Sequence, residues 1–231
     1  MAEPAILALD TATEACSAAL FARGAVTRRL EIAPRGHSEL APQMAEELLR
    51  EAKLEWTQLD ALAVDVGPGA FTGLRIGLGL AQGLAYGANL RVIPVVSLEA
   101  LAFAALEKQN DDGGGGEVLA ALDARMGQVY YGVYRAAPHG VECVAPPALA
   151  EPQKAQIPRG SRRLLGIGGG WDRYAPQLLE AAKGAVKDWR GGQYPLAESA
   201  VRLAALRGMG AAISPLDLRA CYVRDEVAVP A

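Results

Sequence analysis

Residues 64–77 read Val64-Asp65-Val66-Gly67-Pro68-Gly69-Ala70-Phe71-Thr72-Gly73-Leu74-Arg75-Ile76-Gly77. This stretch predicts a strand, a tight Gly-Pro-Gly turn and then a helix that runs to about residue 87. Each glycine inside a helix costs about 1 kcal/mol of helix propensity relative to alanine, and this helix carries several glycines. It is therefore a poor helix unless another element packs closely against its backbone.

The spacing of three glycines in this helix suggests where such an element approaches. Gly79, Gly83 and Gly87 follow one another at four-residue intervals, which places them along one side of a helix as a groove. The helix is apolar on nearly all sides, and such a helix must be buried on nearly all sides. We interpret one side as facing its own domain and the other side as facing a partner.

Two other interpretations of this helix remain. It is also compatible with a central core helix of a large domain. A membrane span is disfavoured, because the apolar run is shorter than the ~20 residues that cross a bilayer and is interrupted by Arg75 and Gln82.

The composition limits the class of protein. The chain has 231 residues, of which 51% are hydrophobic and 6% aromatic; this is typical of a globular protein with one large or two small domains. The net charge of −3 provides no basic field, so we expect no strong direct binding to nucleic acid. The three cysteines show no C-x-x-C spacing, which argues against a disulfide framework or zinc site and favours reduced thiols. With no signal-peptide pattern at the N-terminus, we expect a cytoplasmic protein.

The order of predicted elements indicates an α/β fold with two lobes, residues 1–98 and 99–231, each with a mixed sheet and helices. The Gly-rich run near residues 111–116 is predicted to be a loop, and residues 146–158 an irregular connection. The predicted strands are residues 6–9, 16–21, 26–32, 61–66, 92–96, 117–123, 128–135 and 164–167, and the predicted helices are 38–53, 72–87, one from about 98, 173–184 and 197–209.

The candidate chemical groups are few. Asp10, Thr11 and Thr13 lie in a turn after the first strand, where an acid, hydroxyls and backbone N–H groups can bind phosphate or magnesium. An Asp-Thr turn also satisfies local backbone groups, and this turn has no glycine to admit a phosphate closely. The Gly67-Pro68-Gly69 turn before a helix can bind an anion but lacks the Walker residues. His37 is predicted to have a capping or packing role. The sequence shows no Ser-His-Asp or Cys-His arrangement, and its two histidines are far apart, so we expect few residues suited to catalysis.

Six passages resemble the TsaB (YeaZ) family, the bacterial partner protein in tRNA threonylcarbamoyladenosine synthesis. They are Ile6-Leu7-Ala8-Leu9-Asp10-Thr11-Ala12-Thr13; Arg35-Gly36-His37-Ser38 with Leu40 and Pro42; Gly67 to Gly77; Ser97-Leu98-Glu99-Ala100-Leu101; Leu122-Asp123-Ala124-Arg125 running into Val129-Tyr130-Tyr131; and Tyr222-Val223-Arg224-Asp225. Together they cover most of the first 135 residues and the tail.

The resemblance implies a two-lobed actin-like/Hsp70-like (ribonuclease H-like) fold, shared with the catalytic relative TsaD. In that relative, two histidines after the strand that follows the glycine-rich helix supply metal ligands. Ser97 and Leu101 stand there in this chain; leucine cannot ligate a metal, and a serine hydroxyl is a poor substitute for imidazole. The resemblance therefore implies a pseudo-enzyme without a cofactor, with nucleotide and metal held by the catalytic partner.

The resemblance also implies partners: a homodimer in isolation, a heterodimer with TsaD, and a further ATPase subunit of TsaE type. An independent Mg-ATP-binding ATPase or kinase-like enzyme that uses Asp10 remains the alternative; a metalloprotease would need metal ligands that the chain does not offer. The predicted partner interface consists of Leu40, Met44, Leu48, Thr72, Arg75, Ile76, Gly79, Leu80, Gly83 and Gly87.

Overall fold

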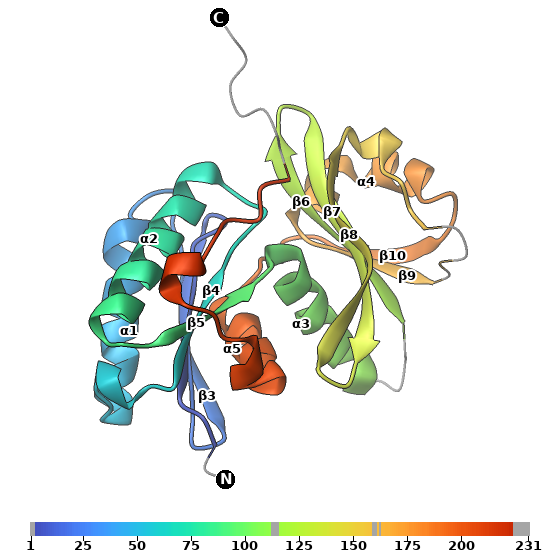
Figure 1. Ribbon diagram of the computed structural model, residues 1–231. Helices are drawn as coiled ribbons and strands as arrows, with labels where there is room; N and C mark the ends of the chain where they lie inside the picture. The colour runs from blue at the N-terminus through green and yellow to red at the C-terminus, as the bar shows by residue number, and fades with distance from the viewer. Residues whose placement is uncertain (1–2, 112–115, 159–160, 162, 224–231) are drawn as a thin grey trace, which may run out of the picture.

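The computed structural model describes residues 3–111, 116–158, 161 and 163–223. Two five-stranded sheets, each covered by helices, form two lobes that stand side by side (Figure 1). Most of the predicted loop near residues 111–116 and the last two residues of the tail motif, at 224 and 225, lie outside the described residues. None of the helices in the described part of the chain has the length and apolarity that a bilayer crossing requires.

The first sheet combines an antiparallel meander with two parallel strands, in the order β3-β2-β1-β4-β5. The N-terminal order of strands and helices predicted from the sequence is confirmed. The elements of this lobe are β1 (Ile6–Asp10), β2 (Ala15–Ala22), β3 (Ala25–Ile32), α1 (His37–Ala52), a short 3₁₀ helix (Trp56–Gln58), β4 (Ala61–Asp65), α2 (Phe71–Gly87) and β5 (Arg91–Val95).

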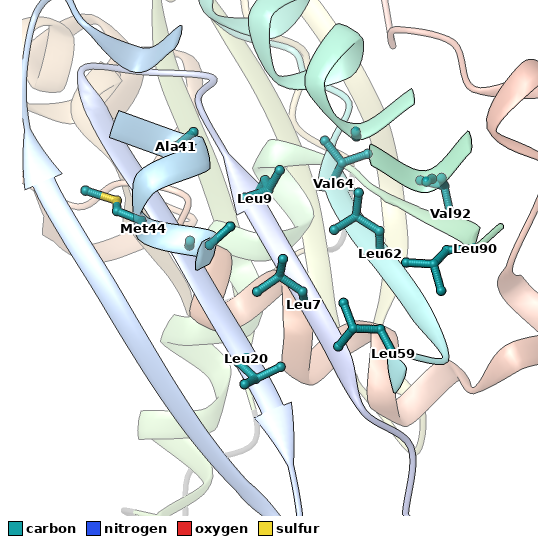
Figure 2. Packing of buried hydrophobic residues seen from close by; sticks show 14 of the residues in the cluster. Leu7, Leu9, Leu20, Ala41, Met44, Leu59, Leu62, Val64, Leu90 and Val92 are labelled. Carbon is teal, nitrogen blue, oxygen red and sulfur yellow. The ribbon is translucent and has the colours of Figure 1, made fainter. Parts of the chain in front are cut away.

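Helices cover both faces of this sheet, which explains why its central strands are apolar without alternation. Leu7 and Leu9 of β1 pack in a cluster with Ala41 and Met44 of α1 (Figure 2). The intervening β1 residues instead pack against α5 (Ala197–Arg207) on the opposite face. The central strand β1 is therefore buried along its whole length.

The second sheet has the order β10-β9-β6-β7-β8, with α3 on one face and α4 on the other. Its elements are α3 (Ser97–Asp111), β6 (Glu117–Arg125), β7 (Gln128–Ala137), β8 (Gly140–Ala150), a 3₁₀ helix (Pro152–Lys154), β9 (Leu164–Ile167), α4 (Gly169–Ala181) and β10 (Val186–Arg190); α5 is followed by 3₁₀ helices at Met209–Ala211 and Pro215–Asp217.

Three features of this lobe differ from what the sequence predicts. Part of the expected irregular connection at 146–158 belongs to β8, which contains Pro146 and Pro147; β8 is an edge strand, where proline is tolerated because no second neighbour needs its N–H. The strand β10 was not expected, since it is short, charged and exposed at the other edge. The helix predicted near 173–184 is α4, which already begins at Gly169, because glycines that resemble a turn form its first residues; its backbone is not helical at Tyr174.

Helix α5 returns the chain to the first lobe. It packs against β1 and β2, and Val92 of β5 pairs with Ile213 beyond the helix. The predicted lobe boundary near residue 98 stays a prediction. It assigns residues 99–231, and with them α5, to the second lobe, whereas α5 packs on the sheet of the first lobe.

Candidate functional site

The glycines at the start of α2 allow close contact with the turn that follows β1. A Cβ at Gly69, Gly73 or Gly77 would overlap with atoms of Thr11 or Ala12. The same contact is held by two hydrogen bonds: the N–H of residue 70 donates to the carbonyl of Ala12 at 2.7 Å, and the Thr11 hydroxyl donates to the carbonyl of Gly73 at 2.8 Å. These three glycines are therefore explained by packing within the chain.

The glycines further along α2 have no such explanation. Gly79, Gly83 and Gly87 are exposed, and a Cβ built on any of them meets nothing within 4 Å. Gly79 and Gly83, inside the helix, each still cost about 1 kcal/mol of helix propensity relative to alanine, and Gly87 is its last residue. Nothing in the described chain requires glycine at these positions.

The side chains around these glycines form a partly apolar surface on α2, which lies beside α1 on the outside of the first sheet (Figure 1). Tyr86 is 74% exposed and Phe71 is 39% exposed; the guanidinium carbon of Arg75 lies 3.9 Å from the centre of the Phe71 ring. We define the glycine face as the exposed or half-buried residues Leu40, Thr72, Arg75, Ile76, Gly79, Leu80, Gly83 and Gly87.

Two of the predicted interface residues do not lie on this surface. Leu48 has no exposed area, and Met44 is 8% exposed. Both pack into the core beneath α1, in the cluster that contains Leu7 and Leu9. The α1 stripe that was predicted to reach a partner faces the sheet instead, so Leu48 is not available to a partner.

A cleft of about 270 Å³ lies between the two lobes. The turn after β1 and the turn before α2 form one wall, and the β6–β7 hairpin, the start of α4 and Tyr194 form the other. Thr13 lines this cleft, but Asp10 and Thr11 do not; they are 0% and 2% exposed. The structure therefore places only one of the three candidate nucleotide-binding residues at the cleft.

The polar groups of the cleft are mainly acidic. Glu14, Asp123 and Asp172 contribute to its lining, against one cation, Arg125. The Asp123 carboxylate also accepts hydrogen bonds from the Arg125 and Arg173 guanidinium groups, each at 3.2 Å. This arrangement is unfavourable for a polyphosphate, because the acids repel it and the arginines are already paired.

A second set of polar side chains, Asp10 and Asp65, lies at the ends of β1 and β4, beneath the turn after β1 and the turn before α2. The Asp10 Oδ1 accepts a hydrogen bond from the N–H of Ala12 at 3.0 Å. The Asp65 Oδ1 accepts two, from the N–H of Gly67 and the Ser97 hydroxyl, both at 2.6 Å. Burial raises the pKa of both carboxyl groups, and the charge of Asp65 raises that of Asp10 further. Asp65 was not predicted as a site residue; the signal was an acid at the end of an otherwise apolar strand.

Comparison with known proteins identifies the family. The family model described as TsaD, tRNA N6-adenosine threonylcarbamoyltransferase, matches residues 30–164. The tRNA threonylcarbamoyladenosine biosynthesis protein TsaB of Escherichia coli is 41% identical over 175 residues, which cover 73% of each chain. The chain belongs to the TsaB (YeaZ) family. The protein of the same name from Haemophilus influenzae is 50% identical over 126 residues, about half of each chain (54% of this one and 52% of that one).

A solved structure agrees over nearly the whole length. YeaZ from Pseudomonas aeruginosa superimposes with a TM-score of 0.86 at 33% identity, covering 96% of this chain and 100% of that one. The TsaB-family chain therefore has the two-lobed α/β actin-like fold, as the sequence predicted.

Within this TsaB-family fold, Ser97 and Leu101, which stand where the resemblance to TsaD implies metal ligands in that relative, have other roles. Ser97 has no exposed area and donates its hydroxyl hydrogen to Asp65, whereas Leu101, 1% exposed, packs in the core around α3. Among the described residues, no group of three or more His, Cys, Asp or Glu side chains is arranged to hold a metal. His37 packs at the start of α1, with its Nε2 2.8 Å from the carbonyl oxygen of Thr13.

Proposed function

We propose that this TsaB-family chain is a non-catalytic partner subunit, which binds and supports the catalytic threonylcarbamoyltransferase subunit TsaD as it makes threonylcarbamoyladenosine in tRNA. The observation that carries the proposal is the exposed row of Gly79, Gly83 and Gly87, where a Cβ meets nothing within 4 Å among the residues that the structure describes. The name of the E. coli relative, tRNA threonylcarbamoyladenosine biosynthesis protein TsaB, supports the pathway.

The glycine face is the surface that we assign to the partner. A row of glycines lets a second helix approach the α2 backbone closely, and a partner that fills this groove supplies the packing that the isolated chain lacks. The half-buried Ile76 and Leu80 and the exposed Arg75 border this groove. A second copy of the chain occupies the face in isolation, and TsaD displaces it, so the homodimer and the heterodimer exclude each other. An ATPase subunit of TsaE type joins the assembly elsewhere.

We also propose that this subunit has no catalytic role of its own. Ser97 and Leu101 are committed to internal contacts, Asp10 is enclosed, and the cleft offers one arginine against three acids. Nucleotide and metal are therefore expected in TsaD and not in this chain. The acidic balance of the sequence supports a role without strong direct binding to tRNA, and we place the protein in the cytoplasm.

Light scattering of the purified protein, alone and after mixing with TsaD from the same organism, tests the proposal. We expect a dimer alone, which converts to a mixed complex of one copy of each chain. The independent ATPase would be favoured if the protein is a monomer that does not bind TsaD, binds Mg-ATP by itself and loses this binding in Asp10→Asn.

A further inference from the structure

Two carboxyl groups lie side by side in the interior of the first lobe. The strands β1 and β4 pair in parallel with Leu9 opposite Val64, which brings Asp10 and Asp65, the next residue of each strand, to adjacent positions. They are 0% and 2% exposed. In the part of the chain that the structure describes, neither forms a salt bridge with a cation.

The hydrogen bonds around this pair leave one oxygen of each group without a donor. Both Oδ1 atoms accept hydrogen bonds from neighbouring groups, whereas the Oδ2 atoms of Asp10 and Asp65 are buried and have no hydrogen-bond donor among the described residues. The two side chains are within hydrogen-bonding reach of each other. Two adjacent buried carboxylates cannot both be ionised without a large cost.

We infer that Asp10 and Asp65 share one proton between their Oδ2 atoms and together form a carboxyl–carboxylate pair with a single negative charge at neutral pH. The donors locate this charge. Asp65 receives two hydrogen bonds, from the Gly67 N–H and the Ser97 hydroxyl, but Asp10 receives one, from Ala12. The proton therefore resides on Asp10 and the charge on Asp65.

Among the described residues, the elements around the pair provide no cation to replace the proton. Cys16 of β2 lies near the pair, and burial raises the pKa of its thiol to about 11. Cys221 of the C-terminal segment, whose N–H donates to the carbonyl of Val66, also has a raised thiol pKa, mainly because of burial. Both thiols are neutral at pH 7. From α3 the pair meets the Ser97 hydroxyl, which is uncharged.

A divalent cation does not suit this position. Ca²⁺ takes 6–8 oxygen ligands and Mg²⁺ demands octahedral coordination, usually with several waters. The pair offers two free carboxylate oxygens and does not line the cleft between the lobes.

The shared proton connects the two turns that hold the start of α2. Asp10 leads into the turn whose Thr11 hydroxyl bonds to Gly73, and Asp65 leads into the turn at Gly67. Loss of the proton leaves two adjacent anions, which push these turns apart. Where the proposed function is correct, this proton also supports the helix that carries the glycine face.

The pH dependence of stability tests the inference without any partner. Both folded-state pKa values are raised above the ordinary aspartate value of about 4, and with one shared proton the folded protein binds one more proton at neutral pH than the unfolded chain, whose aspartates are ionised. The contribution of the shared proton to the free energy of unfolding is fully present in acid. It declines as the pH rises above about 4 towards the raised pKa of the pair in the folded protein. For one proton, the folding equilibrium constant falls up to about tenfold for each pH unit.

The variant Asp10→Asn replaces the shared proton with a permanent amide N–H. Urea unfolding between about pH 5 and pH 8 should show a folding constant that falls with pH in the wild type, relative to Asp10→Asn, by up to about tenfold per unit. The reciprocal variant Asp65→Asn should behave in the same way. The control is Asp60→Asn, which alters an exposed carboxylate that also accepts one backbone N–H, from Ala5 at 2.8 Å; its pH dependence should follow the wild type.

An infrared measurement on the wild type keeps the test valid if a variant does not fold. A carbonyl band of a protonated carboxylic acid at pH 7 supports the shared proton. Absence of this band, or a constant difference between wild type and Asp10→Asn at every pH, overturns it. Stabilisation by Mg²⁺ that disappears in Asp10→Asn overturns it as well, since a cation and not a proton would then join the two groups.

Discussion

The substitution Gly83→Ala separates the stability of the chain from its association, because the structure predicts opposite signs for the two. A Cβ at Gly83 meets no described residue within 4 Å, so alanine adds helix propensity without a clash. The gain is about 1 kcal/mol, which for a chain of this length raises the Tm by about 2–4 °C. At the interface, the same methyl group enters a groove that we propose to be filled by a partner helix. Overpacking there costs about 1–3 kcal/mol and weakens the Kd by about 5- to 150-fold.

The assay has two parts and an internal contrast. Thermal unfolding is followed at protein concentrations low enough for the wild type to be monomeric, and association is followed by light scattering with and without TsaD. Gly83→Leu should abolish pairing while the monomer stays folded. Gly77→Ala, in the same helix, adds a Cβ that would overlap with the Thr11 side chain; it should lower the Tm and leave the pairing surface unchanged.

Two results would refute the reasoning. If Gly83→Ala and Gly83→Leu are both folded and still fully paired, the proposed face is wrong. If Gly83→Ala lowers the Tm of the monomer, the open space around Gly83 is not a property of the isolated chain.

Three further outcomes follow from burial and pKa. Leu48→Ala should destabilise the chain by about 2–5 kcal/mol in urea unfolding. It should leave pairing with TsaD intact, because Leu48 has no exposed area. If the variant is fully folded and pairs more weakly with TsaD, Leu48 belongs to the interface after all. Trp171→Ala should cost about 3–5 kcal/mol by the same measurement, since this indole is fully buried and donates to the Leu119 carbonyl at 3.1 Å. In thiol labelling at pH 8, the exposed Cys143 should react first and Cys16 only after unfolding, because Cys16 is buried and its pKa is raised to about 11; rapid labelling of Cys16 in the native protein would contradict this.

The family resemblance and the first-lobe order were accessible from the sequence because they depend on residues close together in the chain. The Gly67-Pro68-Gly69 turn, the apolar strand before it and the glycines after it lie within one short segment, and local propensities and periodicity describe such a segment well. The strands at the edges of the second sheet carried weaker signals. β8 contains prolines and β10 is mostly charged, so their strand conformation depends on pairing with a neighbour and not on their own composition.

The candidate site needed the tertiary structure. The periodicity of α1 predicted an apolar stripe, but only its packing on the sheet shows that Leu48 faces inward while Gly83 of the neighbouring helix faces outward. The sequence placed Asp10 in a turn, where an exposed ligand was plausible. The register of β1 against β4 instead encloses it beside Asp65, 55 positions away in the numbering. Local sequence determines which elements form, whereas the contacts between elements distant in the chain decide which side chains are buried, which are paired and which remain free for a partner.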